Sequence, residues 1–445
     1  MKYVLLILFV ASGFKVAWNQ DAKNVQLLDV WNDTTIFLGV EDHRYSDLWS
    51  FKSKGENYVA VGTTDGIDVL AIQNDQLVHL AREEGAFQGY TVVHRDLKTY
   101  KNYLFAVCDE GTSSLQIFDT SYLPDSLHKV YDSNAFFTIC HNIYIDTLTA
   151  KLFACGPNGV GMKVIDISNP ENPSLIMDFN NVAYVHDAYV SNDTAFLNCG
   201  ADGLHVYDFS ATMPIQLGLI DFYANQGYNH SGWMSPSKKE YCFIDEDVGT
   251  KIKLCELNDY ALIQIDELFA PSEYLDYTPH NIILLNKTAF VSYYNLGLRI
   301  YDISQRPVKE IGHYDTFEQE TNYTQNGAWG VSIIQDKNQV LIADRQNGIF
   351  LFSVPIDILE SENNGTVITS NPFIDEHSMI LPKDYFEEDE LTFSIFGLDG
   401  SRVYFQESLI NWIEIPLTLS AGAYSFAVYD SNGELLESGK FVKAN

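Results

Sequence analysis

The chain has 445 residues, of which 46% are hydrophobic and only 20% are charged, so it belongs with folded proteins and not with disordered ones. Its 27 Tyr and 27 Phe bring the aromatic content to 13%, which favours sheet over helix. A net charge of −33 repels phosphate backbones and anionic lipid headgroups, and this excludes nucleic acid as a partner.

The N-terminus has the pattern of an export signal. Lys2 precedes an apolar run over residues 3–14, which is too short for a membrane span of about 20 residues and is typical of a signal-peptide core. We expect cleavage before Lys23, so that residues 1–22 form the signal peptide. No other stretch is apolar for long enough to cross a bilayer, and no cysteine stands beside the signal to accept a lipid. The sequence therefore predicts an exported protein without a transmembrane span.

A repeat of about 40 to 50 residues occupies most of the remaining chain. In its clearest copies a glycine is followed by alternating apolar residues and then by Asp-x-Ser, at residues 161–168, 203–210 and 297–304. This pattern describes a strand between two tight turns, and we expect Asp166, Asp208 and Asp302 to cap the second turn. Each period holds four such strands; in the third repeat they are residues 142–146, 151–155, 162–168 and 174–179. Four short strands per repeat are typical of one blade of a β-propeller.

Seven blades are predicted, and the last of them is incomplete. The repeats start near Trp49, His94, His141, His186, His230, His280 and Trp329. After residues 348–354 the chain runs into Pro355 and supplies no fourth strand, whereas residues 25–31 resemble the fourth strands of other repeats. We expect this N-terminal segment to complete the seventh blade and close the ring.

The C-terminal part reads as a separate small domain. Residues 357–367 are polar and break the repeat, so they are predicted to be a linker. Strictly alternating segments follow in residues 368–445, joined by turns at Asp399-Gly400 and Asn432-Gly433. The predicted fold is therefore all-β, with a seven-bladed β-propeller over residues 23–356 followed by a small Ig-like β-sandwich.

The C-terminal module also resembles a known family. Its Asn371-Pro372 pair and residues 396–403, 419–424 and 439–443 are similar to the C-terminal sorting domain of the type IX secretion system of Bacteroidota. The resemblance implies that the type IX secretion machinery is a partner. It also implies that the protein passes through the periplasm to the outer-membrane surface or the medium. An ordinary carbohydrate-binding or adhesive sandwich is the alternative for this module.

The propeller resembles a second family. The motifs at residues 45–49, 94–100, 141–143, 186–188, 230–233, 280–282, 297–299 and 327–329 are similar to those of the LVIVD-repeat proteins called the choice-of-anchor B family. That family combines one propeller with different surface anchors, and the resemblance implies no established activity. The fifth blade departs from the pattern because it lacks the Gly-x-x-x-x-Asp strand.

Candidate site residues gather at one end of the predicted channel. The first strand of a blade lines the channel, and His94, His141, His186, His230 and His280 all precede such a strand. Loops between second and third strands reach the same face, and they carry Asp65, Asp109, Glu110, Asp202, Asp245, Glu246, Asp247 and Asp344. Trp49, Trp233 and Trp329 are expected near the same mouth, where they could stack on a sugar or a peptide.

Two interpretations of the histidines stay open. Imidazole with carboxylate suits zinc, manganese or iron, and the expected metal ligands are His186 and His230 with Asp187, Asp245 or Glu246. In the other interpretation, each histidine bonds a neighbouring blade and locks the ring. The sequence carries no common catalytic motif. We therefore predict a monomeric extracellular binding or scaffold module for a glycan or protein ligand. The alternative is a hydrolase or lyase that uses one divalent metal ion at the channel mouth.

Six cysteines are too few for a disulfide scaffold. We expect them to be buried free thiols, with Cys242 and Cys255 as the only pair considered for a disulfide bond.

Overall fold

The computed structural model describes residues 22–236, 238, 240–258, 261–268, 276–305, 308–317, 325–355 and 358, together with parts of 367–443. The predicted signal peptide up to residue 21 and most of the predicted linker lie outside the described residues. Within the described part of the chain, no helix has the length and apolar character that a membrane span requires.

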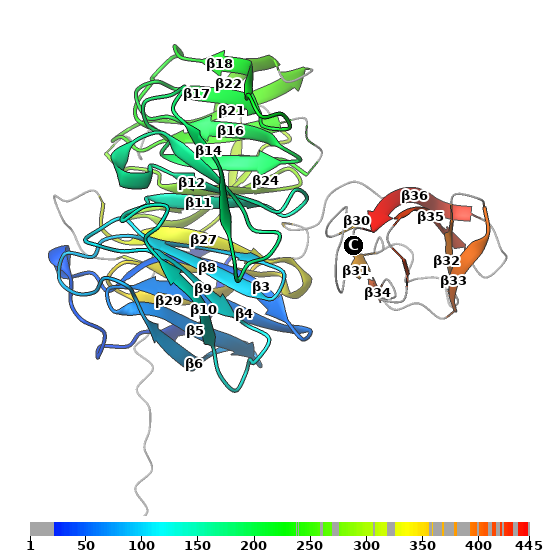
Figure 1. Ribbon diagram of the computed structural model, residues 1–445, viewed down its shortest axis with the longest axis horizontal. Coiled ribbons are helices and arrows are strands. Elements are labelled where there is room, and N and C mark those ends of the chain that lie inside the picture. Colours follow the sequence, from blue (N-terminus) through cyan, green and yellow to red (C-terminus); the bar gives the residue numbers. More distant parts are fainter. Residues whose placement is uncertain are drawn as a thin grey trace, which may run out of the picture.

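Seven four-stranded antiparallel sheets follow one another along the chain, as predicted for a seven-bladed propeller (Figure 1). Blade one contains β3 (Tyr45–Ser53), β4 (Glu56–Thr63), β5 (Gly66–Gln73) and β6 (Gln76–Glu84). Blades two to four are built from β7 (Arg95–Tyr100), β8 (Tyr103–Cys108), β9 (Leu115–Asp119), β10 (His128–Ser133), β11 (Asn142–Asp146), β12 (Lys151–Cys155), β13 (Met162–Asp166), β14 (Ser174–Phe179), β15 (Asp187–Ser191), β16 (Thr194–Asn198), β17 (Leu204–Asp208) and β18 (Ile215–Ile220).

Blades five to seven use the next eleven strands and one strand from the N-terminus. They comprise β19 (Asn229–Met234), β20 (Glu240–Asp245), β21 (Ile252–Asn258), β22 (Ala261–Leu268), β23 (Asn281–Leu285), β24 (Thr288–Tyr293), β25 (Gly297–Asp302), β26 (Lys309–Tyr314), β27 (Ala328–Ile334), β28 (Gln339–Asp344), β29 (Gly348–Ser353) and β2 (Gln26–Trp31). Within the described residues, the short 3-10 turns η1 (Val40–Asp42), η2 (Pro157–Gly159) and η4 (Gln335–Lys337) connect strands.

The N-terminal strand closes the ring, as the sequence predicts. β2 pairs antiparallel with β29, with Gln26 opposite Ser353 and Trp31 opposite Ile349. Two residues of β1 (Ala22–Lys23) add a short fifth strand to blade six through β26. The first and last parts of the propeller are thereby joined through backbone hydrogen bonds, which removes an exposed sheet edge.

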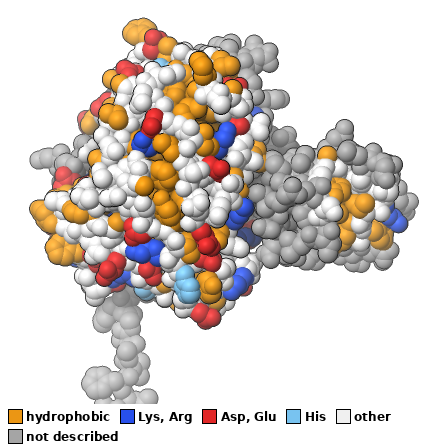
Figure 2. Space-filling model, viewed as in Figure 1, with side chains coloured by type: hydrophobic (Ala, Val, Ile, Leu, Met, Phe, Trp, Pro, Cys, Tyr) orange, Lys and Arg blue, Asp and Glu red, His pale blue; other side chains and the backbone are white. Residues whose placement is uncertain are grey.

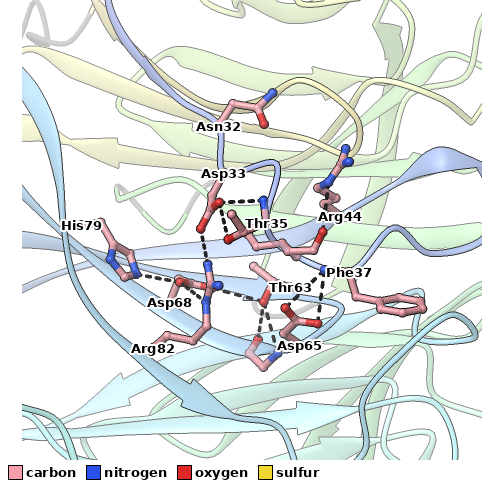
Figure 3. A network of polar contacts seen from close by, with 12 residues as sticks. Asn32, Asp33, Thr35, Phe37, Arg44, Thr63, Asp65, Asp68, His79 and Arg82 are labelled. Atoms are coloured by element: carbon pink, nitrogen blue, oxygen red, sulfur yellow. Dashed lines mark hydrogen bonds and ion pairs between the residues drawn. The ribbon is translucent and has the colours of Figure 1, made fainter.

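A polar network fastens the loop after β2 to blade one (Figure 3). Arg82 on β6 donates to Asp33 in this loop at 2.8 Å and to Asp68 on β5 at 2.8 Å. His79 lies 2.8 Å from the same Asp68 carboxylate, which is fully buried, and its ring stacks on that of Trp31. The closing segment is therefore bonded to blade seven through its backbone and to blade one through its side chains.

The hydrophobic core lies between neighbouring sheets. Alternation places one face of each strand against the next blade; Phe153 and Val164 of blade three, for example, share a buried cluster with Val190 and Leu197 of blade four. The repeated glycine has a steric cause. Gly203 has φ +81°, and a Cβ atom there would lie 2.2 Å from the carbonyl oxygen of Ile220.

The predicted turn caps are confirmed. The carboxylates of Asp166, Asp208 and Asp302 each accept a hydrogen bond at 2.8 Å from the backbone N–H of the serine two residues later.

The expected free thiols are confirmed, and Cys242 and Cys255, the pair considered for a disulfide bond, do not form one. All six cysteines are free and buried. Cys242 on β20 lies opposite Leu254, and Cys255 on β21 lies opposite Tyr241. This offset of one residue sends the two thiols to opposite faces of the sheet, where they join different core clusters.

The C-terminal part, orange to red in Figure 1, contains two small antiparallel sheets. One has β30 (Val367–Ile368), β31 (Ser378–Ile380) and β34 (Trp412–Glu414); the other has β32 (Thr392–Phe396), β33 (Arg402–Glu407), β35 (Gly422–Tyr429) and β36 (Leu435–Lys443). Phe393, Ile395 and Val428 are completely buried in the second sheet. The described C-terminal strands thus add a small all-β region to the propeller.

The face of the propeller shown in Figure 2 does not divide into an acidic and a basic part. On the face shown in Figure 2, acidic and basic side chains are scattered around a run of hydrophobic ones.

Candidate ligand site at the mouth of the channel

Six aromatic rings form a closed circle at one end of the channel. His94, His141, His186, His230, His280 and Trp329 stand at the start of the first strands of blades two to seven. The centroids of neighbouring rings lie between 4.1 Å and 5.3 Å apart all the way round, and the contact between His94 and Trp329 completes the circle. The repeat therefore brings all five predicted histidines together. We call these six residues the mouth ring.

Two histidines of the mouth ring bond the next blade. Nδ1 of His186 lies 3.1 Å from the carbonyl oxygen of His230, and Nδ1 of His280 lies 2.6 Å from that of Trp329. Because a carbonyl oxygen only accepts, Nδ1 must carry the proton in both rings. These bonds match the blade-locking role that the sequence analysis left open.

His141 has a carboxylate partner instead. Its Nδ1 lies 2.7 Å from Oδ2 of Asp109, which follows the second strand of blade two. Burial lowers the pKa of His141, but the hydrogen bond and the charge of Asp109, with a further contribution from Glu246, outweigh burial and raise this pKa overall. His141 and Asp109 thus form a hydrogen-bonded imidazole–carboxylate pair on the rim.

The other imidazoles are neutral at pH 7. Burial lowers the pKa of His94, His186 and His280 well below its usual value, and the neighbouring imidazoles lower it further. Burial, with the charge of His141, lowers the pKa of His230 to about 3. Nearby carboxylates therefore raise the pKa of His141 but not that of these four histidines, because desolvation dominates there.

Glu246 brings a second carboxylate to the mouth ring. Its Oε2 lies 3.5 Å from Nε2 of His230, and its Oε1 accepts hydrogen bonds from the hydroxyl of Tyr294 and, at 3.2 Å, from Gln325. Tyr294 and Gln325 come from loops without a repeated motif, so no sequence pattern pointed to them.

In the part of the chain that the structure describes, two groups of side chains have the arrangement of metal ligands. His141, His186 and His230 form one group, and His230, Glu246 and His280 form the other. In each group, one ligand atom from every residue lies within 4.8 Å of the others. His186, His230 and Glu246 were predicted as metal ligands from the sequence; His141 and His280 join them because adjacent blades place their rings next to each other.

Asp245, predicted as a metal ligand, instead forms a buried ion pair inside the propeller. Its carboxylate accepts from Lys253 Nζ at 2.7 Å, from the Tyr223 hydroxyl at 2.7 Å and from the Gly227 N–H at 2.8 Å. The Asp245 and Lys253 side chains are completely buried. Consecutive residues of an extended chain point to opposite sides, so Glu246 reaches the mouth ring while Asp245 joins this internal ion pair.

Asp187 also falls outside both groups in the described part of the chain. Its Oδ1 accepts the N–H of Ala188 at 2.7 Å. Burial raises the pKa of Asp187 to about 7, although the charge of Lys98 lowers it. The side chain therefore belongs with a buried polar group inside the blades and not with the mouth ring.

Only one of the three tryptophans lies where it was expected. Trp329 is part of the mouth ring, and the Arg345 guanidinium lies 4.9 Å from its ring centre. Trp233 packs instead against Tyr189, with ring centroids 5.2 Å apart, and Trp49 donates to Thr99 at 3.1 Å. Trp233 follows His230 by three residues of one strand, which carries it about 10 Å along the strand.

Comparisons with known proteins identify the fold. No protein-family model matches the chain, and no curated protein matches it in sequence. Among solved structures, a candidate 6-phosphogluconolactonase from Bacteroides uniformis has 15% sequence identity and a TM-score of 0.53, covering 67% of this chain and 90% of that one. A periplasmic gluconolactonase from Pseudomonas aeruginosa has 12% identity and a TM-score of 0.54, covering 71% and 94% of the two chains. The chain therefore shares the seven-bladed β-propeller fold of lactonase-like proteins.

Proposed function

We propose that this protein is an extracellular binding or scaffold module, exported by type IX secretion, with its ligand site at the mouth ring. The apolar run over residues 3–14 and the resemblance of residues 368–445 to sorting domains support this route of export. The closed propeller is a rigid frame, and the mouth ring is where its repeated polar side chains converge.

One observation carries the proposed site. Both ring nitrogens of His94, Nδ1 of His230 and Nε1 of Trp329 are buried and lack a well-aligned hydrogen bond among the described residues, although the backbones of His141 and His280 approach His94 and His230. A buried polar atom without a partner costs about 1 to 3 kcal/mol, so Trp329 Nε1 and the incompletely bonded imidazoles carry a cost unless something else bonds to them. A ligand at the mouth would supply these partners.

The chemistry of the orphaned atoms favours a glycan. Trp329 Nε1 can only donate, whereas a neutral imidazole offers one donor and one acceptor. A sugar hydroxyl both donates and accepts, and a sugar ring also stacks on aromatic faces such as that of Trp329. A protein ligand would have to present its own hydroxyl or amide groups to the same atoms.

The binding test uses changes that keep the shape of the ring. Trp329→Phe and His94→Phe remove orphaned nitrogens but leave an aromatic side chain. If the mouth ring binds an extracellular glycan, a glycan array probed with the full mature chain should give binding that both variants weaken, while their thermal stability is unchanged or higher. Binding that is unaffected by both changes would place the ligand site elsewhere.

The export test uses the C-terminal module. A chain that ends after Ile358 keeps every propeller strand, so it should fold and remain in the periplasm of a host with type IX secretion. Its appearance outside the cell would contradict the sorting role of residues 368–445.

A metal-dependent hydrolase or lyase is the second candidate. The hydrogen-bonded pair of His141 and Asp109 favours it, because an imidazole held by a carboxylate can accept and return a proton. The likeness to lactonase-like proteins extends to the fold alone, which hosts many functions. Turnover in a panel of lactones, glycans and peptides that disappears in Asp109→Asn would support this candidate, and no turnover would count against it.

A further inference from the structure

We propose that His141, His186 and His230 bind one divalent ion of the zinc class, using the ring nitrogens that face away from the bonds to their protein partners. This inference rests on the proposed ligand site at the mouth ring and names a ligand for it. In His141 and His186, Nδ1 makes a hydrogen bond to the protein and Nε2 would face the ion.

The protonation of two ligands is fixed by their partners. Nδ1 of His186 must donate to the carbonyl of His230, and Nδ1 of His141 donates to the Asp109 carboxylate. In a neutral imidazole the other nitrogen then has a free lone pair. Within the described residues, no hydrogen bond reaches Nε2 of either ring. A histidine whose Nδ1–H is held by a carboxylate or carbonyl is the usual form of a metal ligand.

The third ligand can offer a lone pair without losing a hydrogen bond to the protein. Nδ1 of His230 is buried without a well-aligned hydrogen bond among the described residues, the side chain is only 5% exposed, and Nε2 lies 3.5 Å from Oε2 of Glu246. In the neutral imidazole with the proton on Nδ1, Nε2 keeps the lone pair that a metal ion needs.

The spacing requires only a small adjustment. The three ligand atoms lie within 4.8 Å of one another. Zinc–nitrogen bonds of about 2.0 to 2.1 Å in a tetrahedron place ligand atoms about 3.4 Å apart, so closing the site moves each side chain by about 1 Å or less. The ligands stand on the first strands of three adjacent blades, whose backbone can stay in place while the rings rotate.

The surrounding charges favour a cation. Asp109 bonds His141, and Oε2 of Glu246 lies 3.5 Å from Nε2 of His230. Arg345 opposes them with one positive charge, but it stands on the far side of the circle, over Trp329. Three imidazoles with a nearby carboxylate suit zinc, and they do not suit magnesium or calcium, which prefer oxygen ligands.

One variant separates the two roles of the His186 imidazole, the hydrogen bond to the protein and the bond to the metal ion. In His186→Asn, the side-chain amide nitrogen lies where Nδ1 was and can still donate to the His230 carbonyl, but nothing replaces Nε2. His186→Ala removes both groups. His141→Asn is the equivalent change beside Asp109, and His128→Asn, at an exposed position on β10, is the control.

Isothermal titration of the metal-free full chain with Zn²⁺ tests the proposal. We expect one ion per chain, no competition from Mg²⁺ or Ca²⁺, and unchanged binding in His128→Asn. His186→Asn and His141→Asn should lose at least 100-fold in affinity, with melting temperatures in EDTA that stay close to that of the unmodified chain. Asp109→Asn, which removes a positioning residue, should lose about 10- to 100-fold.

Two results would overturn the proposal: no stoichiometric binding of Zn²⁺ by the unmodified chain, or full affinity in both Asn variants. The glycan array, repeated in EDTA, keeps the two proposals apart. Glycan binding that survives EDTA in a chain without zinc affinity would leave the proposed function intact and remove the metal site. Zinc binding without any glycan would do the reverse.

Discussion

Nδ1 of His186 lies 3.1 Å from the carbonyl oxygen of His230, the residue at the equivalent position in the next blade. Nδ1 of His280 has the same relationship with the carbonyl of Trp329, at 2.6 Å. A repeat that places a histidine at this point of successive blades therefore produces a bond between them. Since the bond uses only one nitrogen of the ring, the structural and the ligand-binding interpretations of these histidines do not compete.

The bond between blades predicts a loss of stability in His280→Ala. The Trp329 carbonyl would lose its donor, and we expect the free energy of unfolding in EDTA to fall by about 1 to 3 kcal/mol. His280→Asn keeps a donor at the position of Nδ1 and should recover most of this loss. Urea unfolding of both variants makes the comparison; equal destabilisation by Ala and Asn would mean that the hydrogen bond contributes nothing.

Ring closure predicts that removal of β2 destabilises the whole propeller. Deleting residues 23–31 of the mature chain exposes the edge of β29 and the buried side chains behind it, so the melting temperature should fall sharply. Deleting Lys23 alone removes what the mature chain keeps of β1 and is the control. Differential scanning calorimetry should show a small change for the short deletion; a long deletion that melts like the intact chain would contradict the closure.

The buried pair of Asp245 and Lys253 predicts a large effect from a single change. Both side chains are completely inaccessible and their charged atoms lie 2.7 Å apart. Lys253→Met leaves a buried carboxylate without its cation and should cost about 3 to 5 kcal/mol. Lys163→Met breaks the exposed pair with Asp178 and should cost less than about 1 kcal/mol. Similar losses in the two variants would show that burial does not control the contribution of the pair.

The lowered pKa of Asp33 predicts that the stability of the propeller depends on pH where the N-terminal segment closes the ring. Burial raises the pKa of Asp33, but hydrogen bonds from Thr35 and Arg82 outweigh it and lower this pKa from 3.8 to about 2. A lowered pKa means that the carboxylate stabilises the fold above pH 3.8 and loses this contribution as the pH falls towards 2. The stability difference between the unmodified chain and Asp33→Asn should therefore shrink between pH 4 and pH 2 in urea titrations. A constant difference over this range would contradict the assignment.

The sequence predicted the fold well because its signals are periodic. Glycine at a positive φ, an alternating strand and a capping aspartate recur in several blades, and residues 25–31 could be recognised as the missing fourth strand. The same periodicity placed five histidines at one mouth. Repetition therefore identified both the architecture and the place where a ligand would bind.

The side-chain placements that the sequence pattern does not determine depend on single residues. Asp245 and Glu246 are neighbours in the chain, yet one is part of a buried ion pair and the other faces His230. The same kind of one-residue offset separates Cys242 from Cys255. Strand register and the direction of one side chain decide these cases, and hydrophobic pattern alone does not determine them. Arg345 at the mouth ring comes from a loop with no repeated motif, so the sequence offered no signal for it.

The central claim is that the free nitrogens of the mouth ring converge on one metal ion. Anomalous diffraction at the zinc edge, from crystals of the full chain grown with one equivalent of Zn²⁺, tests it most directly. The account predicts a single strong peak about 2.0 to 2.1 Å from Nε2 of His141 and His186 and from a ring nitrogen of His230. A mouth ring without anomalous density, or a peak only at surface carboxylates, would contradict it.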